Sequence, residues 1–259
     1  MSRILKAWVA MVVVVLLAPT LVVIPMSFSD STTFSFPPKG WSLRWYQNFF
    51  QSPEWVDALF DSLKVGLLAA VIATVVGTSA AIALDRSRFR GRSAVQGAMM
   101  APAIVPSIVI AVAIYIMFLR WHLTGSLIGF VAAHSILAVP FVIVAVNTAL
   151  ANYDRTVEHA SASLGAGPIT TFRRIVLPSL APGIASGFVF AFVTSFDEVV
   201  VALFLQTPDL RTLPVKMYNS ITLQIDPTIA AASSLIVVIT TGVLLIAQFL
   251  PRRRNENAS

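Results

Sequence analysis

Residues 127–150 read LIGFVAAHSILAVPFVIVAVNTAL, and this stretch decides the class of fold. It carries no charged side chain, and the uncharged interval around it reaches from Trp121 to Tyr153. A helix needs about 20 mostly apolar residues to cross the hydrocarbon core of a bilayer. A strand of a membrane barrel needs only about ten residues, of alternating polarity. The sequence therefore predicts a membrane-crossing helix at residues 127–150.

The composition of the whole chain agrees with a membrane protein. Of its 259 residues, 57% are hydrophobic and only 12% are charged, and the mean hydropathy is +0.82. About a quarter of the residues of a soluble domain are charged. Because the chain contains no cysteine, it has no disulfide, thiolate metal ligand or cysteine nucleophile. We therefore exclude a soluble globular domain and a disordered chain, and we predict an all-α membrane protein.

Long apolar intervals recur on both sides of residues 127–150, separated by charged residues and loops. We predict one transmembrane domain over residues 1–259, with an outer loop at 30–64 and an inner loop at 151–178. The outer loop is dense in aromatic residues, which predicts a short helix anchored at the membrane surface or a docking surface for an external partner. The six predicted spans are residues 7–29, 65–84, 93–119, 127–150, 179–206 and 227–251.

The basic residues predict how the spans are oriented. With both termini in the cytoplasm, 12 of the 18 Lys and Arg residues fall in cytoplasmic segments. Four of them lie in the cluster Arg86–Arg92. This positive-inside asymmetry accounts for the net charge of +6, so nothing points to a nucleic-acid partner. The first apolar run also leaves a cleaved signal peptide open, but it is long for one, and we favour a retained helix.

The inner loop predicts a docking element on the cytoplasmic side. Residues 157–168 read VEHASASLGAGP, and residues 169–178 read ITTFRRIVLP. Gly165 suits the left-handed conformation that ends a helix, and Pro168 suits the first turn of the next one. Pro178 then marks the entry to the fifth span. Two short helices of this kind, one of them rich in small residues, suit a groove on another protein.

This loop resembles the EAA loop of permease subunits of binding-protein-dependent ABC importers. The pattern is Glu-Ala-Ala, three residues, Gly, nine residues and Ile-x-Leu-Pro. Here Gly165 is followed by nine residues and then by IVLP at 175–178, which matches. His159 stands in place of the glutamate, with Glu158 one position early, and Ser161 replaces the second alanine. The residues that the resemblance assigns to coupling with an ATPase are Glu158, His159, Ala160, Ser161, Gly165, Leu177 and Pro178.

The resemblance implies a MetI-like importer transmembrane domain in the bacterial inner membrane, whose coupling helix at residues 158–165 enters a cleft of a cytoplasmic ATPase. The chain has no Gly-x-x-x-x-Gly-Lys-[Ser/Thr] motif, so we expect no catalytic residue and no cofactor in it. ATP and magnesium would be bound by the partner. The implied partners are an ATPase subunit dimer, a second homologous permease subunit, a periplasmic solute-binding protein and the lipid bilayer.

The fifth predicted span contains an acidic pair, Asp197 and Glu198. A charge in the middle of a membrane helix costs about 2.5–3.5 kcal/mol on insertion scales, so such residues face a cavity or a partner. In a continuous helix Glu198 shares a face with Thr194 and Ser195, whereas Asp197 faces a neighbouring helix. We predict a substrate path at these four residues. A structural hydrogen-bonded pair inside the bundle is the alternative.

Three other features predict packing inside the bundle. Pro102 and Pro106 indicate a kink in the third span. Gly183 and Gly187 form Gly-x-x-x-Gly, a spacing that favours close approach of helices. His134, in the fourth span, is expected to be packed and hydrogen-bonded rather than to line the substrate path.

The segments SFDEVVV at 195–201 and DPTIAA at 226–231 resemble the spermidine/putrescine permeases of the second-subunit type. This resemblance implies one half of a translocation pore for a small cationic amine, for which an acidic patch is suited. Another small amine, an amino acid derivative or an aminophosphonate stays open as the substrate. An autonomous secondary transporter or channel is a further alternative. An intramembrane enzyme or metal site has no support, since the chain contains no His-Glu-x-x-His motif.

Overall fold

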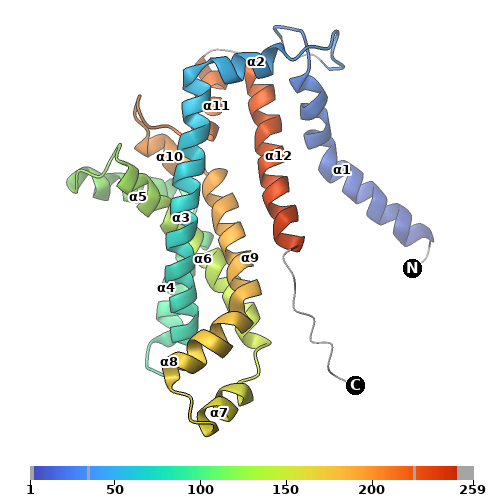
Figure 1. Ribbon diagram of the computed structural model, residues 1–259. Coiled ribbons are helices and arrows are strands. Elements are labelled where there is room, and N and C mark those ends of the chain that lie inside the picture. Colours follow the sequence, from blue (N-terminus) through green and yellow to red (C-terminus); the bar gives the residue numbers. More distant parts are fainter. Residues whose placement is uncertain (1–2, 34–35, 224–225, 250–259) are drawn as a thin grey trace. The chain divides into compact units, whose positions relative to one another are not determined.

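The computed structural model describes residues 3–33, 36–223 and 226–249 (Figure 1). Within these ranges the regular structure is helical, with one isolated β-bridge between Ser29 and Trp41. The predicted all-α fold is confirmed. The helices are α1 Arg3–Ser27, α2 Arg44–Gln51, α3 Pro53–Arg86, α4 Arg92–Ile104, α5 Ser107–Arg120, α6 Leu127–Ala151, α7 Thr156–Ser163, α8 Pro168–Thr171, a π-helical turn Phe172–Val176, α9 Leu177–Phe196, α10 Val200–Leu205, α11 Leu213–Leu223 and α12 Thr228–Phe249.

The chain divides into two compact units. The first unit comprises Met1–Phe60 and Thr212–Gly242, and the second comprises Asp61–Arg211 and Val243–Ser259. The first unit therefore holds α1, α2 and α11, and the second holds α4 to α10. The long helices α3 and α12 each contribute residues to both units.

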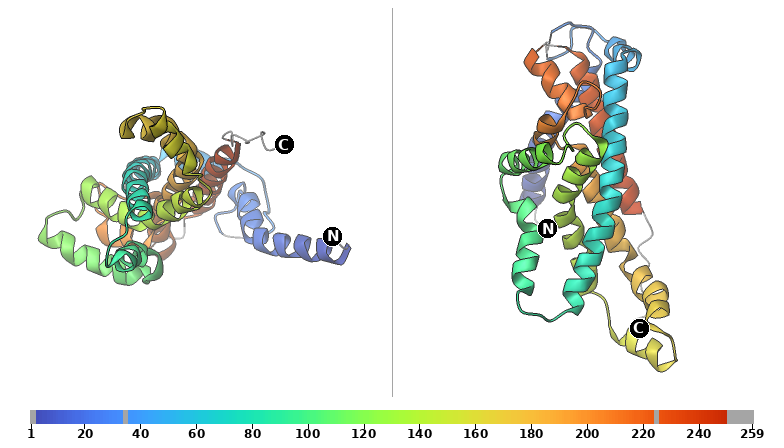
Figure 2. Two further views of the ribbon diagram at one scale, coloured as in Figure 1. Left: turned by 90° about the horizontal axis from the view of Figure 1, so that it is seen from below. Right: turned by 90° about the vertical axis from the view of Figure 1, so that its left-hand side faces the viewer.

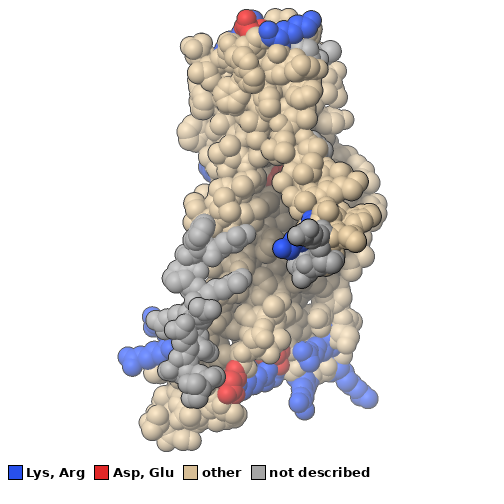
Figure 3. Space-filling model, turned by 90° about the vertical axis from the view of Figure 1, so that its right-hand side faces the viewer, with Lys and Arg blue, Asp and Glu red and all other residues tan. Residues whose placement is uncertain are grey.

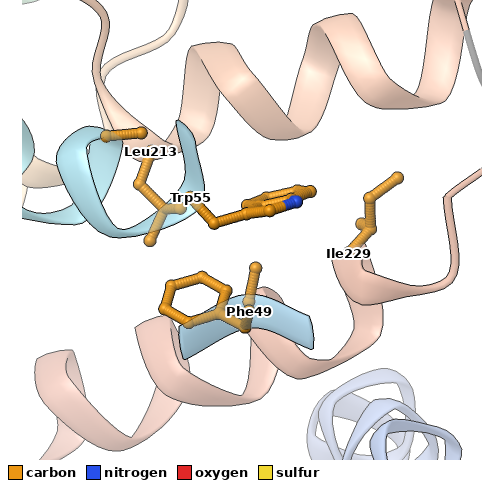
Figure 4. Packing of buried hydrophobic residues seen from close by; sticks show 6 residues of the cluster. Phe49, Trp55, Leu213 and Ile229 are labelled. Atoms are coloured by element: carbon orange, nitrogen blue, oxygen red, sulfur yellow. The ribbon is translucent and has the colours of Figure 1, made fainter. Parts of the chain in front are cut away.

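The aromatic residues of the predicted outer loop build the core of the first unit (Figure 4). Phe49 on α2 and Trp55 on α3 lie with ring centroids 5.7 Å apart, and both pack against Leu213 and Ile229. Trp45 is buried as well, whereas Phe50 is 60% exposed. The prediction of a short helix in this loop is confirmed by α2. The prediction of an aromatic anchor on the membrane surface is wrong for the three buried residues, of which Phe49 and Trp55 are covered by residues of α11 and α12.

A chain of hydroxyl groups joins α1, α2 and α12 in the first unit. The Tyr46 hydroxyl lies 2.7 Å from Ser27 Oγ and 2.6 Å from Ser234 Oγ. Asn48 Nδ2 donates to Thr228 Oγ1 at 2.7 Å. These bonds join α12 to α1 and α2, which lie far before it in the sequence, and each polar side chain finds its partner on another helix.

Four helical stretches among the described residues are long and apolar enough to cross a membrane: Pro53–Arg86, Leu127–Ala151, Pro168–Phe196 and Thr228–Ile246. Two bent pairs pass the same test, and counting each as one span gives up to six. The first pair, Ile4–Ala18 and Thr20–Ser27, is bent by 43°. The predicted span at 227–251 ends outside the described residues, and the arginine run at 252–254 lies wholly outside them.

The third predicted span, residues 93–119, is not one continuous helix. The chain bends by 105° between the axes of α4 and α5. The cause is Pro106, whose ring disfavours the helical conformation of the residue before it. Val105 accordingly takes extended backbone angles, φ −73° and ψ 136°, and α4 ends at Ile104. The predicted kink is confirmed, and it is sharp enough to separate two helices.

The two glycines of Gly-x-x-x-Gly allow α9 to pack closely on α6 in the second unit. A Cβ atom on Gly183 would lie 2.5 Å from the Cβ atom of Ala149 and 3.1 Å from the carbonyl oxygen of Ala145. A Cβ atom on Gly187 would lie 3.2 Å from Val142. The predicted close helix packing is confirmed, because a side chain at Gly183 has no room.

We expect Gly183→Ala to lower the free energy of unfolding by about 1–3 kcal/mol, the usual cost of overpacking. Gly97→Ala on α4 is the matched control, since a Cβ atom there meets nothing within 4 Å. It should leave stability unchanged or raise it by up to about 1 kcal/mol. Thermal unfolding of both variants in detergent measures the difference. Equal midpoints would show that α6 and α9 can separate at no cost.

Candidate functional site

The inner loop folds into a short helix with a glycine cap. Helix α7 is followed by Gly165 at φ +82°. Gly165 N donates to the Ala162 carbonyl at 2.9 Å, and Ala166 N donates to the Ser161 carbonyl at 3.1 Å. These two bonds form a Schellman motif, which needs a left-handed residue at the position of Gly165. The predicted cap is confirmed.

The second half of the loop runs into the fifth span without a break. Gly167 precedes α8 and Pro168 occupies its first position, as predicted. A π-helical turn and α9 then follow directly, so Pro178 lies inside a continuous helix and does not mark its start. In a regular α-helix the ring of Pro178 would meet the carbonyl of Arg174. The wider turn lies just before this proline, with Leu177 N donating to the Phe172 carbonyl.

The helices α7 and α8 lie at one end of the second unit, beyond the ends of α3 and α6 (Figure 1; Figure 2, right). Two large apolar side chains are open at this end: Leu164, just after α7, is 89% exposed and Ile169 on α8 is 75% exposed. His159 and Ala160 are exposed, as are Leu177 and Pro178 on α9. The predicted docking element therefore has an open apolar surface.

Ser161 and Glu158 point away from this open surface. Ser161 is buried, and its hydroxyl lies 2.9 Å from Thr171 Oγ1 on α8. The carboxylate of Glu158 accepts from Arg86 Nη2 at 3.0 Å on each of its oxygens. Arg155 Nη2 donates to Asp85 Oδ2 at 2.5 Å. The four charged residues join the last turn of α3 to the start of α7.

The residues before α7 are also constrained. Asp154 Oδ1 accepts from Thr156 N at 2.9 Å, and Asp154 Oδ2 accepts from the Thr156 hydroxyl at 2.7 Å. These bonds favour the ionised form and hold the pKa of Asp154 below its usual value. Desolvation, reinforced by the neighbouring Glu158 carboxylate, raises the pKa of Tyr153, which stays neutral at physiological pH.

Basic residues gather at the same end of the second unit. The α3–α4 loop and the π-helical turn carry them, and Figure 3 shows basic side chains at the lower end of the face that it draws. By contrast, Arg120 and Arg211 belong to the α5 and α10–α11 segments. The basic residues from the end of α3 to the start of α4, just before α7 and in the π-helical turn are Arg86, Arg88, Arg90, Arg92, Arg155, Arg173 and Arg174.

The acidic pair lies at a helix break. Helix α9 ends at Phe196, and α10 starts at Val200. Glu198 Oε1 accepts from Val200 N at 3.0 Å, and Glu198 Oε2 accepts from Ala202 N at 3.0 Å. The carboxylate therefore caps the first turn of α10, where a negative charge is favoured. The prediction of a continuous helix that places Glu198 on one face with Thr194 and Ser195 is wrong.

The other members of the predicted path lie in different environments. The side chain of Asp197 is exposed, and no hydrogen bond or ion pair to its carboxylate is found within the described residues. Ser195 is buried, with its hydroxyl 2.8 Å from Nδ1 of His134. Thr194 is half-buried. The carboxylate of Asp197 is thus open, whereas that of Glu198 caps a helix. A role of any of these residues in the substrate path stays a prediction. The packed, hydrogen-bonded state predicted for His134 is confirmed.

Two parts of the site were missed in the sequence. The pairing of the Asp85-Arg86 dipeptide with α7 was missed, although adjacent opposite charges at the end of a span are a weak signal for it. The helix break was missed because apolar residues continue on both sides of it. Among the described residues, no group of three or more His, Asp or Glu side chains is placed to hold a metal ion.

The fold is that of an α-helical protein with several helices long and apolar enough to cross a membrane, and the inner loop forms two short helices at one end of its second unit. The chain belongs to the family of binding-protein-dependent transport system inner membrane components, whose sequence pattern matches residues 73–255. The permease resemblance drawn from the EAA-like loop is thereby confirmed.

Relatives of known function agree with this family. The chain is 30% identical over 254 residues to the spermidine/putrescine transport system permease protein PotC of Haemophilus influenzae, covering 97% of each chain. It is 29% identical to PotC of Escherichia coli strain K12, covering 92% of this chain and 90% of the relative. The putrescine transport system permease protein PotI of the same strain is 35% identical over 124 residues, covering 48% and 44%.

Solved structures show the same fold. One neighbour is a bacterial alginate ABC transporter in complex with an alginate pentasaccharide-bound periplasmic protein, with a TM-score of 0.73, 17% identity and coverage of 99% of this chain and 96% of that chain. Another is the methionine transporter MetNI in inward-facing conformations, with a TM-score of 0.61, 16% identity and coverage of 74% and 92%. At these identities the likeness establishes the ABC importer transmembrane fold and nothing of the substrate.

Proposed function

We propose that the chain forms one half of the translocation pore of an ABC importer for a small cationic amine, in the first place a polyamine such as spermidine or putrescine. The observation that carries the proposal is the segment α7–α8. It has the Gly165 cap of the EAA pattern and an exposed apolar surface around Leu164 and Ile169. A surface of this kind needs a partner to cover it. A cytoplasmic ATPase dimer is the partner that the EAA pattern implies.

The proposed orientation places α7 and α8 in the cytoplasm of a bacterial cell, with the chain in the inner membrane. The support is the arginine-rich end of the second unit, which includes Arg86, Arg88, Arg90 and Arg92 next to the docking segment. Cytoplasmic segments of membrane proteins carry the excess of Lys and Arg. By the same alternation both termini are cytoplasmic.

The proposed substrate is supported by two observations. Relatives that share nearly the full length of the chain are named as spermidine/putrescine permeases. The exposed carboxylate of Asp197, at the break between α9 and α10, also suits an ammonium group. Another small amine, an amino acid derivative or an aminophosphonate is the alternative substrate, to be separated from polyamines by competition.

Reconstitution with the natural partners tests the function. Affinity purification from native membranes should recover an ATPase, a second permease subunit and a periplasmic solute-binding protein. The complex in proteoliposomes should take up radiolabelled spermidine or putrescine only when ATP is inside with the ATPase and the binding protein is outside. Uptake by this chain alone, without ATP, would instead establish an autonomous carrier.

A further inference from the structure

The contact between α3 and α7 consists of two ion pairs of opposite sense. Asp85 and Arg86 are consecutive residues at the end of α3. Asp85 pairs with Arg155, which immediately precedes α7, and Arg86 pairs with Glu158 in its first turn. Arg155 Nη2 also lies 3.4 Å from the Asp85 carbonyl oxygen. An acid–base dipeptide on one helix thus faces a base and an acid on the other.

This crossed arrangement specifies one register of the two helices. If α7 moved so that its charged residues exchanged neighbours, Arg86 would face Arg155 and Asp85 would face Glu158. Both contacts would then bring like charges together, which is unfavourable. The pairs therefore favour the observed position and oppose the displaced one, whereas a single ion pair would only favour the first.

The helix ends strengthen the same arrangement. Arg86 lies in the last turn of α3, where a positive charge is favoured, and Glu158 lies in the first turn of α7, where a negative charge is favoured. The side chains remain partly exposed, at 42% and 21% for Arg86 and Glu158. Exposed pairs contribute little to folding stability. Their effect is to fix the position of α7 rather than to stabilise the fold.

The remaining contacts of α7 lead to a different helix. The hydroxyls of Ser161 and Thr171 join α7 to α8, and α8 continues through the π-helical turn into α9. Among the described residues, the side-chain bonds that lead from α7 and Arg155 to α3 are these ion pairs. Motion of α7 can therefore reach α9 along the chain, but it reaches α3 through four charged side chains.

We propose that Asp85, Arg86, Arg155 and Glu158 are positioning residues that make α3 move together with α7 during transport. The inference rests on the proposed function, since it takes the ATPase as the cause of the motion. It also assigns Glu158 to a contact within this chain. The exposed His159 is then the residue that stands toward the ATPase at the position of the motif glutamate.

The ratio of substrate uptake to ATP hydrolysis in proteoliposomes tests the inference, because a weakened link between α7 and α3 lowers uptake for each ATP consumed. We expect Glu158→Gln to lower this ratio about threefold, and Arg86→Glu or Glu158→Arg to lower it about tenfold, which is the range for losing and for reversing an exposed ion pair. The swap Arg86→Glu with Glu158→Arg should restore the ratio to within about twofold of the wild type.

Arg90→Glu is the matched control, because it makes the same change of charge on the α3–α4 loop at an exposed residue outside the ion pairs. It should leave the ratio unchanged. The inference is overturned if the reversed single variants keep the wild-type ratio, if the swap is no better than either of them, or if Arg90→Glu lowers the ratio equally.

Assembly separates failure of the inference from failure of the proposed function. If the wild-type chain recovers no ATPase from native membranes, the proposed function fails, and the inference fails with it. If the complex assembles and transports but the reversed variants keep the wild-type ratio, the inference alone fails. Should a reversed variant not assemble, Glu158→Gln and the swap still decide, because neither places like charges opposite each other at positions 86 and 158.

Discussion

Replacement of Gly165 by valine should reduce uptake to less than about a tenth of the wild-type rate, while the amount of inserted protein stays unchanged. The φ of +82° is a left-handed conformation that disfavours side chains by about 1–2 kcal/mol, more for a β-branched one. A Cβ atom there meets nothing within 4 Å, so the variant has no internal clash. The strain is relieved by undoing the Schellman turn, which misplaces α7 relative to α8.

Gly165→Asn is the control for this prediction. Asparagine tolerates the left-handed conformation, so this variant adds a side chain without the same backbone strain. It should retain at least about half of the wild-type uptake, since the turn and its two hydrogen bonds are kept. Initial rates of uptake, normalised to the inserted protein, measure both variants. Full uptake in Gly165→Val would contradict the role of α7 as the coupling helix.

Replacement of Asp197 by asparagine should raise the KM for a cationic amine about tenfold, because an open carboxylate is exchanged for a neutral amide of the same shape. Asp197→Glu keeps the charge and should change the KM much less. Uptake measured over a range of putrescine concentrations separates the two variants. An unchanged KM in Asp197→Asn would show that the substrate passes elsewhere.

Replacement of Glu198 by glutamine should act on stability instead. Each oxygen of its carboxylate accepts one backbone N–H bond from the first turn of α10. The amide of glutamine has one oxygen, so it can replace only one of these two acceptors. We expect the free energy of unfolding to fall by about 1 kcal/mol, the typical value of a helix cap. Thermal unfolding in detergent checks this. If instead Glu198→Gln raises the KM with no loss of stability, the roles of the two carboxylates are reversed.

The sequence predicted the local backbone features of the inner loop well. Gly165 and Pro168 act through their own backbone restrictions, which do not depend on distant residues. The class of fold was predictable for a similar reason, since the length of an apolar run is a local property. The six spans were placed less accurately. The chain bends by 105° between α4 and α5 at Pro106. The size of this bend depends on packing, which a sequence pattern does not contain.

The acidic pair and the aromatic residues show why the rest could not be predicted. The two apolar runs on either side of Asp197 look like one helix until Glu198 is seen to bond the backbone after it. Phe49 and Trp55 read as surface anchors because their partners, Leu213 and Ile229, lie more than a hundred residues further along the chain. For the aromatic residues the deciding contact is tertiary, whereas for Glu198 it is a local bond between side chain and backbone that the apolar pattern does not reveal.

Helix α8, the π-helical turn and α9 are continuous, so this segment can tilt as one rod. Its 29 residues, Pro168–Phe196, span about 40 Å at the rise of an α-helix. If the segment tilted by about 5° about its α8 end, its other end at Phe196 would be displaced by about 3–4 Å over that length. The far end is the break at Asp197 and Glu198. A motion imposed on α8 would therefore reach the exposed carboxylate of Asp197 and the capping carboxylate of Glu198.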